Sequence, residues 1–196
     1  MEDAMNILVI DGHPDPAAER LCHVLATRYA EAATDAGHAV RRIDVHTLAI
    51  DFLRSQKEYE KTAAPAWAAA AQEDLLWSEH VLLVYPLWLG TMPALLKAFL
   101  EQVLRPDFAF DYKASDKAEA RLKGRSARIV VTMGMPAVAY RWWFFAHSLK
   151  SLERNILKFT GMGPVRHTLL GGVAAADEAK RRSWFDAMAA LGRQAR

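Results

Sequence analysis

The chain has 196 residues, of which 52% are hydrophobic and 24% are charged. This composition is typical of one globular domain and excludes disordered, collagenous and coiled-coil proteins. The formal net charge is only +2, and basic residues are interspersed with acidic ones, so the chain lacks the basic surface that nucleic-acid binding requires. A single cysteine, Cys22, excludes an intramolecular disulfide and a metal site built on cysteines. We find no targeting segment or bilayer-spanning stretch and expect a single cytoplasmic domain over residues 1–196.

Five short apolar segments predict the strands of a parallel sheet. Residues 6–11, 80–85 and 127–133 are almost continuously apolar, which is typical of interior strands buried on both faces. The segments 40–45 and 165–170 are interrupted by polar residues and are predicted to be edge strands. With helical patterns between them, these segments indicate a doubly wound α/β sandwich, a five-stranded parallel sheet in the order 2-1-3-4-5 with helices on both faces.

The helices are predicted from apolar residues at helical spacing and from residues that favour helix ends. We expect one helix to end at Gly37, two to begin at Pro65 and Pro93, one to span 148–160 and the last to begin near Asp177. Thr91 is a candidate N-cap for the helix at Pro93.

The candidate site lies in the loops after the first, third and fourth strands, because ligands of doubly wound sheets bind at the carboxyl ends of the strands. The first loop, 12–16, leads into a helix whose free N–H groups favour a phosphate, and His13 and Arg20 would add donors. The residues alone slightly favour a strand-capping His13 and a solvated Arg20. Cys22 is better explained by packing than as a low-pKa thiol. No GxGxxG, P-loop, GxSxG or HExxH motif is present, and we predict no metal site.

The other two loops are rich in apolar and aromatic residues. The loop 85–93 has such residues where polar turn residues are normal, which favours a wall for a flat ligand and a lid on the core equally. The next loop begins at Thr132 and leads to Tyr140 and to four consecutive aromatic residues, 142–145. Tyr140 and His147 form a pair suited to proton movement near neutral pH, although an interface residue and a helix cap explain them equally well.

Together, these loops resemble those of the flavodoxin-like NAD(P)H:quinone oxidoreductase family, which includes DT-diaphorase and its bacterial relatives. Residues 10–14 match the family's first strand and histidine, and 20–22 stand near its Ser-Phe-Asn, with extra residues before them. Residues 86–97 resemble its Pro-Leu...Pro-Ala-x-Leu-Lys segment, 108–112 its Phe-Ala-Tyr-x-Tyr stretch and 132–135 its Thr-Thr-Gly-Gly. The resemblance spans roughly residues 6–170.

The resemblance implies a flavodoxin-like homodimeric flavoenzyme with its site at the subunit interface. Such an enzyme passes hydride from NADH or NADPH through flavin to a quinone or similar flat acceptor in a ping-pong cycle. It implies Tyr140 and His147 as catalytic residues and Phe110, Tyr112 and Trp143 as substrate-binding residues. The implied cofactor-binding residues are His13, Arg20, Leu21, Cys22, Pro86, Leu87, Trp88, Leu89, Thr132, Met133, Gly134 and Met135.

Two other functions remain open at this stage. One is a regulatory flavoprotein that binds a membrane transport protein, for which the aromatic residues are the only indication. The other is a one-electron flavodoxin-type carrier, which the net charge of +2 disfavours because such carriers have acidic surfaces. The chain length and the altered Ser-Phe-Asn segment favour FMN over FAD, whereas the electron donor and acceptor stay open.

Overall fold

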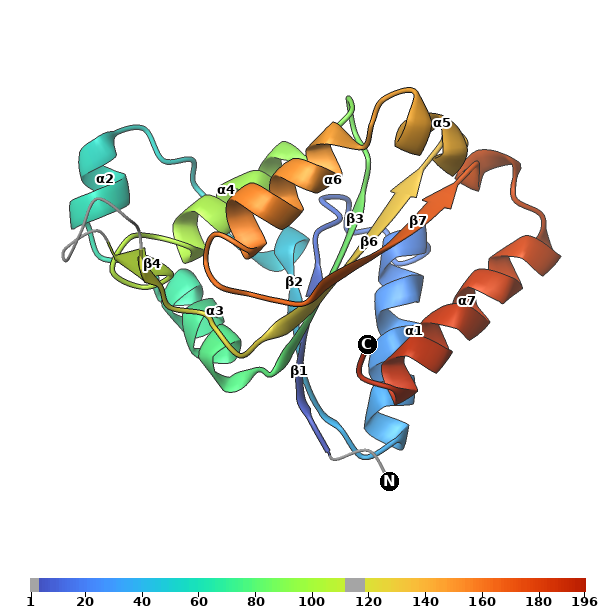
Figure 1. Cartoon of the computed structure of the whole chain (residues 1–196), viewed down its shortest axis with the longest axis horizontal. Helices are drawn as coiled ribbons and strands as arrows, with labels where there is room; N and C mark the ends of the chain where they lie inside the picture. Colours follow the sequence, from blue (N-terminus) through green and yellow to red (C-terminus); the bar gives the residue numbers. More distant parts are fainter. Residues whose placement is uncertain (1–3, 112–118) are drawn as a thin grey trace.

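The computed structural model describes residues 4–111 and 119–196, in which strands alternate with helices (Figure 1). The elements are β1 (Asn6–Asp11), α1 (Leu21–Asp35), β2 (Ala39–Asp44), η1 (Val45–Thr47), α2 (Gln56–Lys61), α3 (Ala66–Trp77), β3 (His80–Pro86), α4 (Ala94–Val103), β4 (Phe110–Asp111), β5 (Glu119–Ala120), β6 (Ser126–Met133), α5 (Ala137–Trp142), α6 (His147–Ser151), η2 (Leu152–Leu157), β7 (Val165–Gly171), η3 (Val173–Ala175) and α7 (Glu178–Arg193).

The main sheet has five parallel strands in the order β2-β1-β3-β6-β7, which confirms the predicted doubly wound topology. Every residue of β3 is buried, and so is every residue of β6 after the first, because both faces of these strands are covered. The outer strands β2 and β7 are largely exposed or half-buried, as their interrupted apolar patterns predicted. The short strands β4 and β5 form a separate antiparallel pair.

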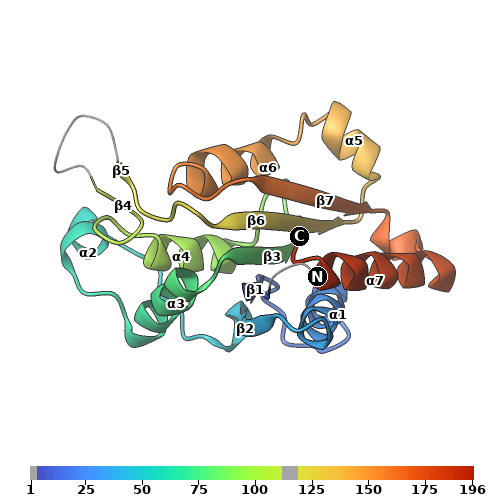
Figure 2. The ribbon, with the colours of Figure 1, turned by 60° about the horizontal axis from the view of Figure 1, so that its bottom comes forward.

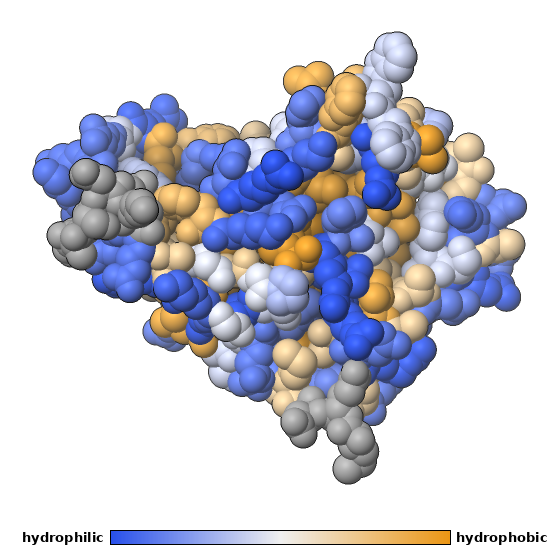
Figure 3. Space-filling view, viewed as in Figure 1, coloured by the Kyte–Doolittle hydropathy of each residue, from blue (hydrophilic) through white to orange (hydrophobic). Residues whose placement is uncertain are grey.

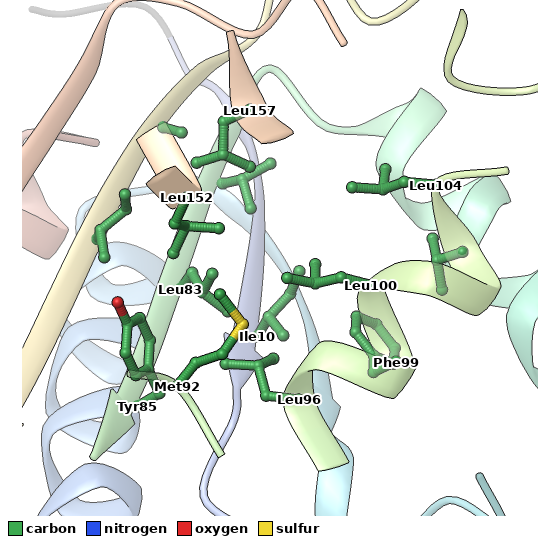
Figure 4. Packing of buried hydrophobic residues seen from close by; sticks show 14 of the residues in the cluster. Ile10, Leu83, Tyr85, Met92, Leu96, Phe99, Leu100, Leu104, Leu152 and Leu157 are labelled. Atoms are coloured by element: carbon green, nitrogen blue, oxygen red, sulfur yellow. The ribbon is translucent and has the colours of Figure 1, made fainter. Parts of the chain in front are cut away.

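Helices cover both faces of the sheet (Figures 1 and 2). On one face, α1 and α7 pack together so closely that a Cβ on Gly192 would lie 2.3 Å from the carbonyl oxygen of Tyr29. On the other face, α4 and η2 contribute apolar side chains such as Leu96 and Leu152, which pack against Ile10 of β1 and its neighbours (Figure 4). In the described part of the chain, none of the helices combines the length and the apolar character needed to cross a membrane.

The helix ends are confirmed in most places and differ in two. Pro65 and Asp177 immediately precede α3 and α7, and the Asp177 carboxylate accepts a hydrogen bond from the Lys180 amide at 2.8 Å. Thr91, however, does not cap α4. Pro93 occupies the N-cap position, and Thr91 instead exchanges two backbone hydrogen bonds with Trp88, closing a tight turn.

The predicted helix over 148–160 is also divided. Its first part is α6, and the chain then continues as the π-helical segment η2. Before α6, the residues Phe145 and Ala146 adopt positive φ angles of 52° and 48°, which separate α6 from the extra helix α5. Two successive left-handed residues that are not glycine leave no recognisable signal in an apolar sequence.

Candidate functional site

The three predicted loops meet at the carboxyl ends of β1, β3 and β6, and hydrogen bonds join them. The Gly12 amide after β1 donates to the Val84 carbonyl of β3 at 2.7 Å. The Leu87 amide after β3 donates to the Thr132 carbonyl of β6 at 2.8 Å. The Thr132 hydroxyl also lies 3.3 Å from the Cys22 sulfur of α1. The loops therefore form one connected edge.

The end of β7 packs against the loop after β6 and makes a hydrogen bond with it. The Gly172 amide donates to the Met135 carbonyl at 3.0 Å. A Cβ on Gly171 would lie 2.2 Å from the Ala137 amide nitrogen and 2.7 Å from the Met135 carbonyl oxygen, so only glycine allows this approach. Sequence reasoning missed this role, although a Gly-Gly pair directly after an edge strand was the available signal.

His13 and Arg20, which were predicted to bind a phosphate, both contact Asp15 in the first loop. The Asp15 amide donates to Nδ1 of His13 at 3.1 Å, and Arg20 Nε donates to the Asp15 carboxylate at 2.7 Å. The hydrogen bond from the Ala17 amide, together with Arg20, lowers the pKa of Asp15 below its ordinary value. The loop is thus ordered by contacts within itself.

Among the described residues, no acidic side chain accepts a hydrogen bond from the backbone amides at the N-terminus of α1. Arg20 is its N-cap residue but makes no side-chain capping hydrogen bond, and the first turn contains no acidic residue. The Val24 amide donates to the Arg20 carbonyl, which leaves the amides of residues 21–23 to bind an anion, and the helix dipole favours such binding. This donor set fits a phosphate group, and the phosphate site stays a prediction.

The loop after β3 exposes apolar side chains at the same edge. The Trp88 side chain is 49% exposed and Leu89 is fully exposed, so neither acts as a lid on the chain's own core. Leu89 also has a positive φ of 46°, a strained conformation for a leucine. Figure 3 shows apolar side chains along this upper edge, near α5 and the loop after β3. The wall for a flat ligand stays a prediction that these exposed side chains fit.

A buried charged network beneath the first loop was not predicted. His23 of α1 lies with Nδ1 2.6 Å from the Asp11 carboxylate and Nε2 2.8 Å from the Asp15 carbonyl oxygen. Arg42 of β2 donates to the same oxygen of Asp11 at 3.2 Å. Asp11 itself is fully buried. No motif marks these residues, because strand pairing brings them together from distant parts of the sequence.

Ligand atoms of His23, Asp44 and His46 lie within 4.8 Å of one another, a spacing that a metal ion needs. Two of the three residues already have partners. Both ring nitrogens of His23 make hydrogen bonds, and the Asp44 carboxylate accepts from Arg42 at 2.8 Å. A metal ion would have to displace these contacts, so the network is better described as a set of hydrogen-bonded charges.

Tyr140 and His147 do not form the predicted pair. The Tyr140 hydroxyl is buried, lies 2.8 Å from the Ser148 hydroxyl and accepts a hydrogen bond from the Leu149 amide at 3.1 Å. The His147 side chain is exposed, and its ring centroid lies 5.7 Å from that of Phe145. The left-handed turn at Ala146 causes the difference, since it directs the residues after His147 toward the tyrosine.

The predicted substrate-binding residues lie apart within one chain. Phe110 of β4 is buried edge-to-face against Phe159, with ring centroids 5.0 Å apart, and lines a cavity of about 590 Å³ beside α4. Trp143 directly follows α5 and is exposed, and Figure 1 shows α5 at the opposite side of the molecule from β4. Tyr112 lies outside the described residues. A shared substrate pocket would need Phe110 from a second subunit.

Comparisons with known proteins agree with this fold. The Flavodoxin_2 family model, described as a flavodoxin-like fold, matches residues 5–191. A Haemophilus influenzae protein named as an uncharacterized NAD(P)H oxidoreductase is 24% identical over 186 residues, covering 93% of this chain and 91% of that protein. An FMN-dependent NADH:quinone oxidoreductase of Beijerinckia indica is 27% identical, covering 85% and 88%. The structure of an NAD(P)H:quinone oxidoreductase from Methanothermobacter marburgensis has a TM-score of 0.84 at 20% identity, covering 99% and 100%.

Proposed function

Because the chain belongs to the Flavodoxin_2 family, we propose that it is a cytoplasmic, FMN-dependent NAD(P)H oxidoreductase that reduces quinones or similar flat acceptors. The observation that carries this proposal is the connected edge of three loops, which combines an uncapped helix N-terminus with the exposed apolar side chains of Trp88 and Leu89. The names of the Haemophilus and Beijerinckia relatives support the donor, the acceptor class and the cofactor. A free, buried Cys22 agrees with a reducing compartment.

The residues present fit FMN in two parts. The first-turn amides of α1 and His13 would hold the phosphate, which needs hydrogen-bond donors and positive potential. Pro86, Leu87, Trp88 and Leu89 would lie along the flat ring. At the opposite loop, Gly134 is exposed, and no heavy atom lies within 4 Å of the position of a Cβ, so its backbone is open to the polar edge of a ring.

When bound, FMN supplies the redox chemistry that joins NAD(P)H to the acceptor. The chain's own contribution is to bind, to orient and to exclude water. Tyr140 positions the segment from α5 to α6 through its hydrogen bonds with Ser148 and the Leu149 amide. We expect a homodimer in which the exposed Trp143 and a second subunit complete the acceptor pocket, because large aromatic side chains left exposed together are typical of contact surfaces.

Flavin loading tests this function directly. We would mix the purified protein with FMN, remove free flavin by desalting and record the visible spectrum, then add NADH or NADPH without oxygen, followed by menadione. Retained flavin that loses its absorption with pyridine nucleotide and regains it with menadione is the expected result.

Other outcomes would contradict the proposal. Failure to retain flavin favours a binding or regulatory protein, for which co-purification with a membrane transport protein is the decisive observation. A stable semiquinone during stepwise reduction favours the one-electron carrier.

A further inference from the structure

His23 lies under the β1–α1 loop and makes hydrogen bonds through both ring nitrogens. Its Nε2 faces the Asp15 carbonyl oxygen at 2.8 Å, and a carbonyl oxygen only accepts, so Nε2 carries a proton. Its Nδ1 faces the Asp11 carboxylate at 2.6 Å. The same carboxylate oxygen accepts a hydrogen bond from Arg42, so it is the acceptor in its contact with Nδ1 too. Nδ1 therefore carries a proton as well. A histidine protonated on both nitrogens is an imidazolium ion.

The charges around His23 agree with this protonation state. Burial alone would lower the pKa of His23, but the hydrogen bonds to Asp11 and to the Asp15 carbonyl raise it above its ordinary value, with a contribution from Asp44. The charged and titratable groups that face His23 come from β1, β2, η1 and the loop. They are Asp11, Arg42, Asp44, His46, His13 and Asp15.

His13, in contrast, is a neutral imidazole. Its Nδ1 accepts a hydrogen bond from the Asp15 amide, which leaves the single proton on Nε2. Burial and the neighbouring charge of His23 lower the pKa of His13. Its ring lies between those of His23 and Trp88, at centroid distances of 5.3 and 5.8 Å. No described residue accepts a hydrogen bond from Nε2 of His13. This nitrogen is also not fully buried, so a ligand can reach it.

We propose that His23 is a buried imidazolium ion that positions the β1–α1 loop and directs the Nε2–H of His13 toward a phosphate-bearing ligand. The chain of contacts runs from Asp11 through His23 to the Asp15 carbonyl oxygen, and from the Asp15 amide to His13. His23 is a positioning residue, and its charge adds to the positive potential at the start of α1. The choice of FMN as the ligand rests on the proposed function.

The first experiment measures protonation in the flavin-free protein. Long-range ¹H–¹⁵N correlation spectra at pH 7 distinguish the imidazolium ion from the two neutral tautomers. We expect both nitrogens of His23 to be protonated and His13 to carry its proton on Nε2. A neutral His23 at pH 7 would overturn the proposal.

The second experiment compares FMN with riboflavin, which lacks the phosphate, by quenching of flavin fluorescence. His23→Gln is matched by His38→Gln, because both histidines are 6% exposed and both make hydrogen bonds through two ring nitrogens; the partners of His38 are backbone groups near the other end of β2. We expect His23→Gln to weaken FMN binding by about tenfold, as for a lost charge-assisted contact, with little effect on riboflavin. Equal losses in the two variants would show a structural role only.

The pH profile is a readout that a merely structural role would not change. Because the pKa of His23 is raised, the imidazolium ion persists to a higher pH than an ordinary histidine and is lost as the pH rises through that pKa. The preference of the wild-type protein for FMN over riboflavin should fall over that range, and the fall should be absent in His23→Gln. An identical profile in both proteins would contradict the proposal.

The proposed function and this inference fail separately. If the wild-type protein binds neither flavin, the proposed function is wrong, yet the protonation of His23 is still decided by the spectra. The amide resonance of Asp15 then reports positioning. It should shift in His23→Gln and stay unchanged in His38→Gln, and the absence of that difference would overturn the positioning role.

Discussion

The Tyr140 hydroxyl lies 2.8 Å from the Ser148 hydroxyl, and this contact closes the junction between α5 and α6. The same oxygen accepts the Leu149 amide hydrogen, so one buried phenol satisfies two polar groups. The tyrosine therefore holds the exposed aromatic segment before α6 in place. A direct catalytic partnership with His147 has no support in this arrangement.

Tyr140→Phe should lower the free energy of unfolding by about 1–3 kcal/mol, because the buried Leu149 amide loses its acceptor. We also expect flavin reduction by NAD(P)H in the loaded protein to slow by about tenfold, because the segment from α5 to α6 that the phenol positions would shift. Chemical denaturation and stopped-flow absorbance measure the two effects. Ser148→Ala is the matched variant, since it keeps the phenol and removes only one partner. An unchanged reduction rate in Tyr140→Phe would remove the tyrosine from the mechanism.

Gly171→Ala should displace the loop after β6. The added Cβ would lie 2.2 Å from the Ala137 amide nitrogen, where no flexible side chain can yield. We expect a loss of stability of about 1–3 kcal/mol, as for other overpacked sites, together with weaker FMN binding. Gly163→Ala is the control, because nothing lies within 4 Å of its Cβ position. Thermal unfolding and flavin titration of both variants check this, and similar behaviour in the two would disprove the role of Gly171.

Trp88→Ala should weaken FMN binding about five- to tenfold without lowering the stability of the flavin-free protein, as expected when an aromatic contact with a ligand is lost. Leu76→Ala provides the comparison, since Leu76 is 53% exposed and Trp88 is 49% exposed. Fluorescence titration with FMN and thermal unfolding give the two readouts. If Trp88→Ala binds FMN as the wild type does, the loop after β3 is not the wall of the flavin site.

Cys22 should be chemically inert in the folded protein. Burial raises the pKa of its thiol to about 12, so almost no thiolate, the reactive form, exists at pH 8. Alkylation by iodoacetamide, followed by mass spectrometry, should therefore be slow in buffer and fast in denaturant. Rapid modification of the native protein would show that α1 opens readily or that the thiol is activated.

The interior strands were predictable because continuous apolar runs such as 80–85 record burial on both faces, whatever the rest of the fold. The edge strands were predictable because polar residues interrupt their apolar runs, as expected for strands that are not buried on both faces. The three site loops were also predictable, since strand order alone determines which strand ends meet. For these features, the pattern of apolar residues along the chain is sufficient for the prediction.

The contacts inside the site were not predictable in the same way. Arg42 reaches Asp11 only through the register of β1 against β2, in which Arg42 stands opposite Val9. The pairing of Tyr140 with Ser148 depends on left-handed backbone at Phe145 and Ala146, neither of which is a glycine. Both relationships arise from tertiary geometry that overrides local preference.

Thr132 takes part in two loop contacts through separate atoms, its carbonyl holding Leu87 and its hydroxyl meeting Cys22. The two contacts connect the loop after β3 and the start of α1 to the end of β6, so we expect the three loops to move together. Hydrogen exchange at the Leu87 and Gly12 amides should then proceed through a single shared opening, with matching free energies. A ligand that binds any one of the loops would slow exchange in all of them, and the site would close or open as a unit.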